Sequence, residues 1–297
     1  MKNTALTLWC AALLFVAGCK KETTPDPVPP VIVPTTPGDN DHILLGNPTN
    51  AQPNAGMGNN YFKDNKYYKI GYSSSRGIPI WVSWHLQSSD VGSTPRQDDF
   101  RPDTLPSSWY SVTNASYSNS GFDRGHNCPS GDRTSSVPAN SSTFLMTNII
   151  PQAPKLNQGP WEGLEDFIRN SLVGTANEAF IIMGNYGTGG TATTTVVNTI
   201  DNGMVTVPKM VWKVAVILPK GNNDLTRLDT SAKVLVVNMP NDNNLYSTSV
   251  SGKDGWKNYV VSINQLEAAA AVEGVSLDLL SAVNATVKTY LKNKKYQ

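Results

Sequence analysis

Short apolar runs rich in β-branched and aromatic residues alternate along the chain with loops rich in Gly, Asn, Ser and Pro. Apolar runs of this length, bounded by turn-forming residues, are typical of β-strands. The pattern predicts strands at residues 80–84, 143–150, 179–183, 211–218 and 233–237.

Helical spacing of apolar residues is found in the second half of the chain. Between residues 161 and 172 one side carries Trp161, Leu164, Phe167, Ile168 and Leu172. Ser262, with Gln265 three residues later, is typical of a capping box and predicts a helix at 262–273, and a third helix is expected at 276–292. Strands with few intervening helices predict an α+β fold, with an antiparallel central sheet flanked by helices and long loops.

The N-terminus has the pattern of an export signal. Lys2 precedes an apolar run at 6–16 that is too short to span a bilayer. The tetrapeptide at 16–19, Val-Ala-Gly-Cys, is similar to the lipobox of bacterial lipoproteins. We therefore expect a signal peptide at 1–18 and a lipidated Cys19 that anchors the exported protein to a membrane, in the periplasm or at the cell surface. The alternatives are an ordinary cleaved signal and an anchor that is retained.

The next segment, 19–45, contains a Pro/Thr-rich stretch that favours extended polyproline II, so it is predicted to be a tether. No repeat or second linker follows, and residues 46–297 are expected to form one domain. Of the three cysteines, Cys10 would leave with the signal and Cys19 would carry lipid. Cys128 then has no disulfide partner, so stability must come from a packed core.

Charge and histidine positions narrow the functional classes. The formal net charge is +1, which argues against a protein that binds nucleic acid through a large basic surface. It leaves room for an enzyme that needs only a few arginines and a metal ion at one phosphate. His42 and His85 have no carboxylate or cysteine neighbours at metal-ligand spacing, so neither is expected to bind metal.

The segment 123–126, Asp-Arg-Gly-His, contains side chains that could take part in catalysis. His126 can be neutral near neutral pH and accept a proton from water, and the guanidinium of Arg124 suits a phosphate. Thirty-one residues after His126, Asn157 offers a hard carbonyl oxygen that suits Mg²⁺ and would not select zinc. Asn157 also stands where a helix would begin, and asparagine is a favoured cap.

Glu165 follows Asn157 by eight residues. On an ideal helix this is roughly 12 Å along the axis and about 80° around it. Both side chains can point toward one cleft, but direct ligation of one ion by both would be strained. Glu165 is therefore predicted to hold a water bound to the ion.

These residues, in this order and spacing, resemble the DNA/RNA non-specific endonuclease family, whose active site is a ββα-metal unit. The resemblance covers about residues 60–275. It includes the segments 123–126, 147–152 and 156–165, with weaker matches at Arg96, 183–187, 207–213 and 265–267.

The resemblance implies Mg²⁺ as the cofactor, with Mn²⁺ as a substitute, and DNA and RNA as substrates. His126 would be the general base, Asn157 the only direct protein ligand of the ion and Glu165 its water-holding partner. Arg124 and Arg96 would neutralise the phosphate, with Arg101 as the alternative to Arg96 in the same loop. Asp123 and Asn148 would support the site.

The same resemblance implies products and specificity. The ion would stabilise the leaving 3′ oxygen, so products would carry 5′-phosphate and 3′-hydroxyl ends. Contacts to phosphate and metal read no base edge, which implies little sequence preference. No protein partner is implied.

The competing interpretation is a catalytically silent surface lipoprotein that binds nucleic acid or a partner without cutting. A binding protein would not need a base and a metal ligand together, so the joint presence of Arg124, His126, Asn157 and Glu165 favours the enzyme. A zinc-dependent hydrolase is disfavoured because the sequence lacks an evident ligand set.

Overall fold

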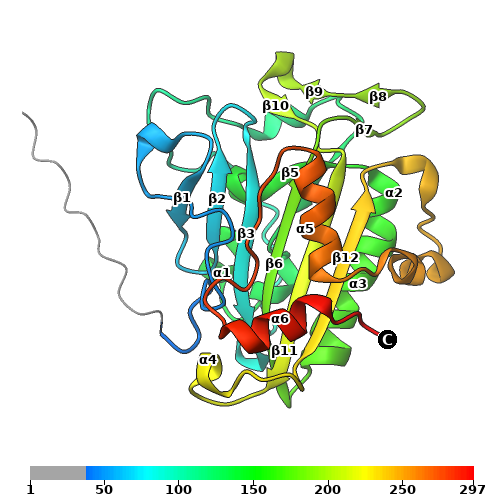
Figure 1. The fold of residues 1–297 in the computed structure, drawn as a ribbon. Coiled ribbons are helices and arrows are strands. Elements are labelled where there is room, and N and C mark those ends of the chain that lie inside the picture. The colour runs from blue at the N-terminus through cyan, green and yellow to red at the C-terminus, as the bar shows by residue number, and fades with distance from the viewer. Residues whose placement is uncertain (1–37) are drawn as a thin grey trace, which may run out of the picture. The chain divides into compact units, whose positions relative to one another are not determined.

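A six-stranded antiparallel sheet organises the computed structural model, which describes residues 38–297 (Figure 1). The strand order is β1-β2-β3-β6-β11-β12. The strands are β1 (Tyr61–Asp64), β2 (Lys69–Ser73), β3 (Ile78–Leu86), β6 (Asn177–Tyr186), β11 (Met210–Pro219) and β12 (Lys233–Pro240).

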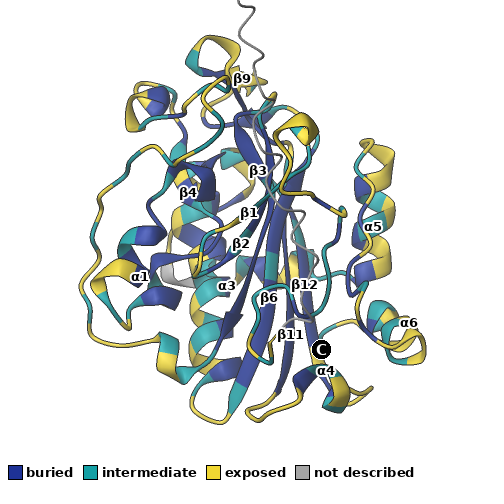
Figure 2. Ribbon diagram, turned by 90° about the vertical axis from the view of Figure 1, so that its left-hand side faces the viewer, coloured by how far each residue is buried: buried dark blue, intermediate teal, exposed yellow. Residues whose placement is uncertain are grey.

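Both faces of this sheet are buried. In β11, Val211 and Ile217 belong to one hydrophobic core, whereas Trp212 and Val216 belong to the other. Figure 2 shows the sheet between α5 (Ile263–Val272) and α6 (Ala285–Asn293) on one side and α3 and β4 on the other. Strands that are buried on both faces read as nearly continuous apolar runs, which is why the sequence reveals them.

The segment that carries the Asp-Arg-Gly-His motif forms one strand of a two-stranded sheet, and a helix follows the second strand. Strand β4 (Asp123–His126) pairs antiparallel with β5 (Ile149–Gln152), so that Asp123 lies opposite Gln152. The helix runs through α2 (Pro154–Leu156), a π-type turn at Asn157–Trp161, α3 (Glu162–Asp166) and a second π-type turn at Phe167–Val173. Gly159 leaves helical geometry at φ −110° and ψ −111°, and the helix is kinked there.

Short elements complete the described part of the chain. They are α1 (Val137–Ser142), α4 (Asp224–Arg227), β7 (Gly190–Thr191), β8 (Val196–Val197), β9 (Thr199–Ile200) and β10 (Val205–Thr206), together with 3-10 turns. Within residues 38–297, no helix is both long and apolar enough to cross a membrane.

The structure confirms the α+β class, the antiparallel sheet and four of the five predicted strands, as β3, β6, β11 and β12. The capped helix is also confirmed, because the Ser262 hydroxyl accepts from the N–H of Gln265, whose side chain accepts in return from Ser262. The helix predicted at 161–172 is part of the longer segment that begins at Pro154.

Two predicted elements were wrong in extent. The strand expected at 143–150 is a strand only from Ile149, because Asn148 donates through its side chain to the carbonyl of Thr143 and closes a turn instead. The last helix begins at Ala285 rather than 276, after a cap at Asn284. The preceding Leu279 and its neighbours are buried in turns, where tertiary packing overrides helical periodicity.

The predicted signal peptide, Cys19 and most of the tether lie outside the described residues. Residues 38–45, which the sequence assigned to the tether, are described and pack against the domain. Leu44 is buried in the core, and the carboxylate of Asp39 accepts from the backbone N–H groups of Asn223 and Asp224 at 2.8 and 2.7 Å. The packed domain therefore includes this segment.

Candidate active site

A cavity of about 430 Å³ brings together four of the predicted site residues. Arg96 comes from a long loop, Asp123 and Arg124 come from β4, and Asn157 comes from the helix that follows β5. The ββα arrangement explains the convergence, because β4 pairs with β5 and β5 leads directly into the helix. The cavity offers two guanidinium groups for an anionic ligand, beside the carboxylates of Asp98 and Asp123, which also line it.

His126 ends β4 and supplies an imidazole that is held by aromatic rings. Its ring meets Phe144 edge-on with 4.9 Å between centroids and meets Phe100, which lines the cavity, at 5.5 Å. The Nε2 atom is buried and has no hydrogen-bond partner within the described residues. Burial, with smaller contributions from Arg96 and Arg124, lowers the pKa of His126 to about 3, so the ring is a neutral proton acceptor at neutral pH.

Arg124 lies over an aromatic face. Its guanidinium carbon is 4.2 Å from the centroid of the Phe100 ring, and the guanidinium also donates to the side-chain oxygen of Asn114. Cation–π contact and the hydrogen bond fix the direction of an otherwise flexible side chain. Sequence analysis did not identify Phe100, which lies in a loop, or Asn114, which begins the 3-10 turn Asn114–Tyr117, because neither segment has apolar periodicity.

The structure also distinguishes the two loop arginines. Arg96 lies over the Phe144 ring at 4.8 Å and donates to the hydroxyl of Ser130 at 2.8 Å, and it lines the cavity. Both arginines pair with a neighbouring carboxylate at 2.7 Å, Arg96 with Asp98 and Arg101 with Asp99, but Arg101 does not line the cavity. Arg96 is therefore the loop arginine at the cavity.

Asn157 is tied to β4 through its side-chain amide. Its Nδ2 donates to Oδ2 of Asp123 at 2.8 Å, and Nε2 of Gln158 donates to the same oxygen at 2.8 Å. No hydrogen bond between described residues ends on Oδ1 of Asn157, so this hard carbonyl oxygen remains free for a cation. The prediction that Asn157 caps the helix was wrong, because the helix begins a turn earlier, after Ala153, and the Asn157 N–H donates to the Ala153 carbonyl at 2.9 Å.

Asn148 holds the chain just beyond His126. It lies in the turn Met146–Asn148 immediately before β5, rather than on the strand as expected. Its side chain accepts from the N–H of Cys128 and donates to the carbonyl of Cys128, both at 2.9 Å. Cys128 is free and buried, and burial raises the pKa of its thiol to about 12. These bonds fix the backbone two residues after the histidine.

Glu165 faces the central sheet. Its carboxylate accepts from Nζ of Lys213 at 2.9 Å, and that ammonium, on β11, also lies 4.7 Å from the centroid of the Trp161 ring. Burial raises the pKa of Glu165, against the opposing effect of Lys213. Glu165 does not line the cavity, and the angle calculated for an ideal helix does not apply across the kink at Gly159.

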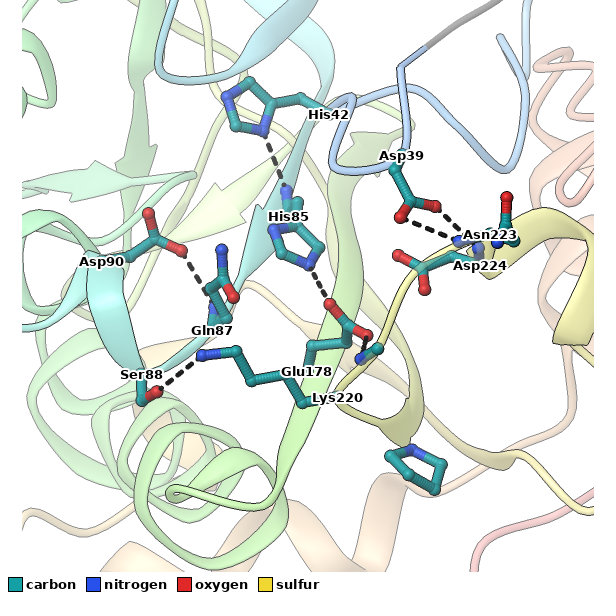
Figure 3. A network of polar contacts seen from close by, with 12 residues as sticks. Asp39, His42, His85, Gln87, Ser88, Asp90, Glu178, Lys220, Asn223 and Asp224 are labelled. Carbon is teal, nitrogen blue, oxygen red and sulfur yellow. Dashed lines mark hydrogen bonds and ion pairs between the residues drawn. The ribbon is translucent and has the colours of Figure 1, made fainter.

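A second group of ionisable side chains was not foreseen. One ligand atom each of His85, Glu178 and Asp224 lies within 4.8 Å of the others, an arrangement that could hold a metal ion. From the sequence, His85 was expected to have no carboxylate at metal-ligand spacing, but the fold brings one close to it. The pairing of β3 with β6 places Phe180 opposite His85, and Glu178 lies two residues further along β6 on the same face. Figure 3 shows the contact between His85 and Glu178.

Comparison with known proteins agrees with this geometry. The model of the DNA/RNA non-specific endonuclease family matches residues 45–286. A protein named Nuclease from Nostoc sp. is 38% identical over 285 residues, covering 96% of this chain and 95% of that protein. Human mitochondrial endonuclease G is 33% identical over 124 residues, 41% of each protein.

A solved structure shows the same fold. The crystal structure of the EndoG/EndoGI complex matches with a TM-score of 0.65, over 86% of this chain and 96% of that chain, at 22% identity. The family match covers the strand with the Asp-Arg-Gly-His motif and the helix that carries Asn157. The chain therefore belongs to the DNA/RNA non-specific endonuclease family and is a nuclease.

Proposed function

We propose that this nuclease is Mg²⁺-dependent and hydrolyses phosphodiester bonds of DNA and RNA to 5′-phosphate and 3′-hydroxyl ends, with His126 as the general base. One observation carries the proposal. The Nε2 atom of His126 is buried without a hydrogen-bond partner among the described residues, next to two arginines at a polar cavity. A buried acceptor that nothing satisfies is costly and needs a functional reason.

The donor set at the cavity fits Mg²⁺, or Mn²⁺ in its place. Asn157 would hold the ion through Oδ1, because its Nδ2 is committed to Asp123. Asp123 would thus act as a positioning residue that turns the carbonyl oxygen toward the cavity. When bound, the ion would supply stabilisation of the charge that develops on the leaving 3′ oxygen.

His126 would take the proton from the attacking water through Nε2. A pKa of about 3 makes a weak base, but Arg96 and Arg124 are part of the cause. A phosphate bound between the two guanidinium groups would offset their charge and bring the pKa of His126 back toward its ordinary value, closer to the optimum for proton transfer. The substrate would thereby strengthen the base that activates the attacking water.

The arginines would stabilise the charge that builds on the phosphate, and their aromatic supports would keep them in place. Glu165, although it does not line the cavity, would orient a water beside the ion, with Lys213 holding its carboxylate. Asn148 would support His126 through the backbone of Cys128. Contacts through phosphate and metal explain low sequence preference.

Incubation of the purified full chain with plasmid DNA and with RNA should give cleavage with Mg²⁺ and none with excess EDTA.

His126→Ala should reduce the rate by at least about 10² to 10⁴, because base catalysis is typically worth that much. Asn157→Ala should lose activity but recover part of it at high Mg²⁺ or Mn²⁺. Product 5′ ends should accept a label from a polynucleotide kinase only after phosphatase treatment.

Arg101→Ala is the matched control, since Arg101 lies in the same loop as Arg96 but not at the cavity. It should retain activity, whereas Arg96→Ala should lose it. Folding of each variant is checked by circular dichroism. A wild-type chain that binds DNA but cuts neither substrate would support the silent binding protein, and near-normal turnover of His126→Ala would remove His126 from its role.

The buried neutral state of His126 also predicts a pH dependence of stability. Its pKa is about 3 when folded and near 6.5 when unfolded, so the unfolded chain binds the extra proton between these values. The free energy of unfolding should therefore rise with pH through this window and become level above it. In urea titrations with EDTA, wild type should lose about 1.4 kcal/mol more per pH unit between pH 5.5 and 4.5 than His126→Gln. Equal slopes would contradict a buried neutral imidazole.

We further propose that Cys19 carries a lipid anchor on an exported protein and that the Pro/Thr-rich tether links it to the nuclease domain. Cys19→Ser should release an active protein from the membrane fraction, because the tether is too polar to bind lipid itself. Cell fractionation with radiolabelled fatty acid measures this, and Cys10→Ser should change nothing if the signal is cleaved. Equal membrane retention of both variants, without label, would indicate an uncleaved anchor.

A further inference from the structure

A buried group of three side chains lies outside the catalytic cavity. His85 of β3, Glu178 of β6 and Asp224 of α4 are 2%, 1% and 1% exposed. None of the three lines the cavity that holds Asn157. Figure 3 shows the imidazole and the two carboxylates turned toward one another, at the ends of strands that meet the β11–β12 connection.

One oxygen of each carboxylate binds Arg227, and the other oxygen does not. Arg227 donates to Oε1 of Glu178 and, through Nε, to Oδ1 of Asp224 at 2.8 Å. The other side faces His85, whose Nε2 lies 2.9 Å from Oε2 of Glu178. The second oxygen of Asp224, Oδ2, is buried and has no hydrogen-bond partner within the described residues.

Charge at this place is unbalanced. In the described residues, the ion pairs of Glu178 and Asp224 involve only Arg227 and the His85 ring. A third carboxylate, Asp39, adds negative charge beside Asp224, where it accepts from backbone N–H groups. Lys220, which passes nearby in Figure 3, reaches the Ser88 hydroxyl instead. Burying a carboxylate oxygen without a partner is strongly unfavourable, so a further cation is expected.

We propose that His85, Glu178 and Asp224 bind one structural zinc ion through Nε2, Oε2 and Oδ2. One imidazole nitrogen and two carboxylate oxygens are ligands that zinc accepts, whereas Mg²⁺ and Ca²⁺ favour sites made of oxygen alone. Arg227, on the opposite carboxylate oxygens, would hold both groups in orientation as partners behind the ligands. The ligand atoms, now within 4.8 Å of one another, would draw together around the ion.

Such an ion would stabilise the fold rather than take part in cleavage. It would join β3 and β6 to the connection between β11 and β12, and through Asp39 it would stabilise the segment at 38–45. The site would therefore fasten elements that are far apart in the sequence.

The test uses the full chain with Asn157→Ala, which removes the proposed catalytic ligand, stripped with EDTA and then dialysed against zinc chloride. Elemental analysis should find close to one zinc per chain, and zinc should raise the unfolding temperature by several degrees. Adding Asp224→Asn, which keeps the size of the side chain and an acceptor for Arg227, should abolish both effects. Asp229→Asn, an exposed carboxylate of the same connection, is the matched control and should change neither.

Anomalous diffraction at the zinc edge from crystals of the Asn157→Ala chain gives a result that needs no variant of the site. A peak between His85, Glu178 and Asp224 is expected. If zinc does not bind, or if it binds elsewhere and survives Asp224→Asn, the group is a buried ion-pair network and the proposal is overturned. Should Asp224→Asn fail to fold, the anomalous peak alone decides.

Discussion

The hydrogen bond from the Asn157 amide to the Asp123 carboxylate connects the two elements that carry the candidate active site. Asp123 begins β4, the strand that ends with His126, and Asn157 lies in the first turns of the helix that follows β5. The bond therefore joins the strand that carries His126, the proposed base, to the helix that carries Asn157, the proposed metal ligand. It also determines which end of the Asn157 amide faces the cavity, since a side chain that donates through nitrogen presents its oxygen elsewhere.

The charge state of His126 depends on the residues that are packed around it. His126 is buried between aromatic rings, and the guanidinium groups of Arg96 and Arg124 add to the cost of protonating it. The cavity is lined by two guanidinium groups and by the carboxylates of Asp98 and Asp123, and burial, aided by the two arginines, keeps the nearby His126 ring neutral. A phosphate bound between the two guanidinium groups would offset their charge, so in the proposed mechanism His126 would be a stronger base in the substrate complex than in the free enzyme. Aromatic faces under each arginine keep this arrangement ready before substrate arrives.

Sequence reasoning succeeded where local pattern and structure agree. The central strands are apolar on both faces, Ser262 and Gln265 form the predicted box, and the motif residues Asp123, Arg124 and Asn157 meet at one cavity. It failed where side-chain contacts and packing, and not the apolar pattern, determine the local structure. The run at 143–150 has strand composition, but the side-chain bonds of Asn148 turn it, and the apolar residues before Ala285 pack without forming a helix.

The contacts of Phe100, His85 and Glu178 could not be predicted from the sequence for the same reason. Phe100 supports Arg124 from a loop without periodicity, and no spacing in the sequence indicates which ring a guanidinium will stack on. His85 and Glu178 are 93 residues apart and meet only because β3 and β6 pair. Register between distant strands is set by the whole core, so such pairs cannot be predicted from local pattern.

The Mg²⁺ concentration that gives half-maximal cleavage, compared among wild type, Asp123→Ala and Asp123→Asn, tests the central claim most directly. Asparagine keeps an oxygen that can accept from Asn157, whereas alanine does not. Because loss of a residue that orients a metal ligand typically weakens metal binding about 10 to 100-fold, Asp123→Ala should raise the half-maximal concentration by that factor, with much activity restored at saturating Mg²⁺. Asp123→Asn should shift it far less. An unchanged Mg²⁺ dependence in Asp123→Ala, or equal shifts in both variants, would contradict the account.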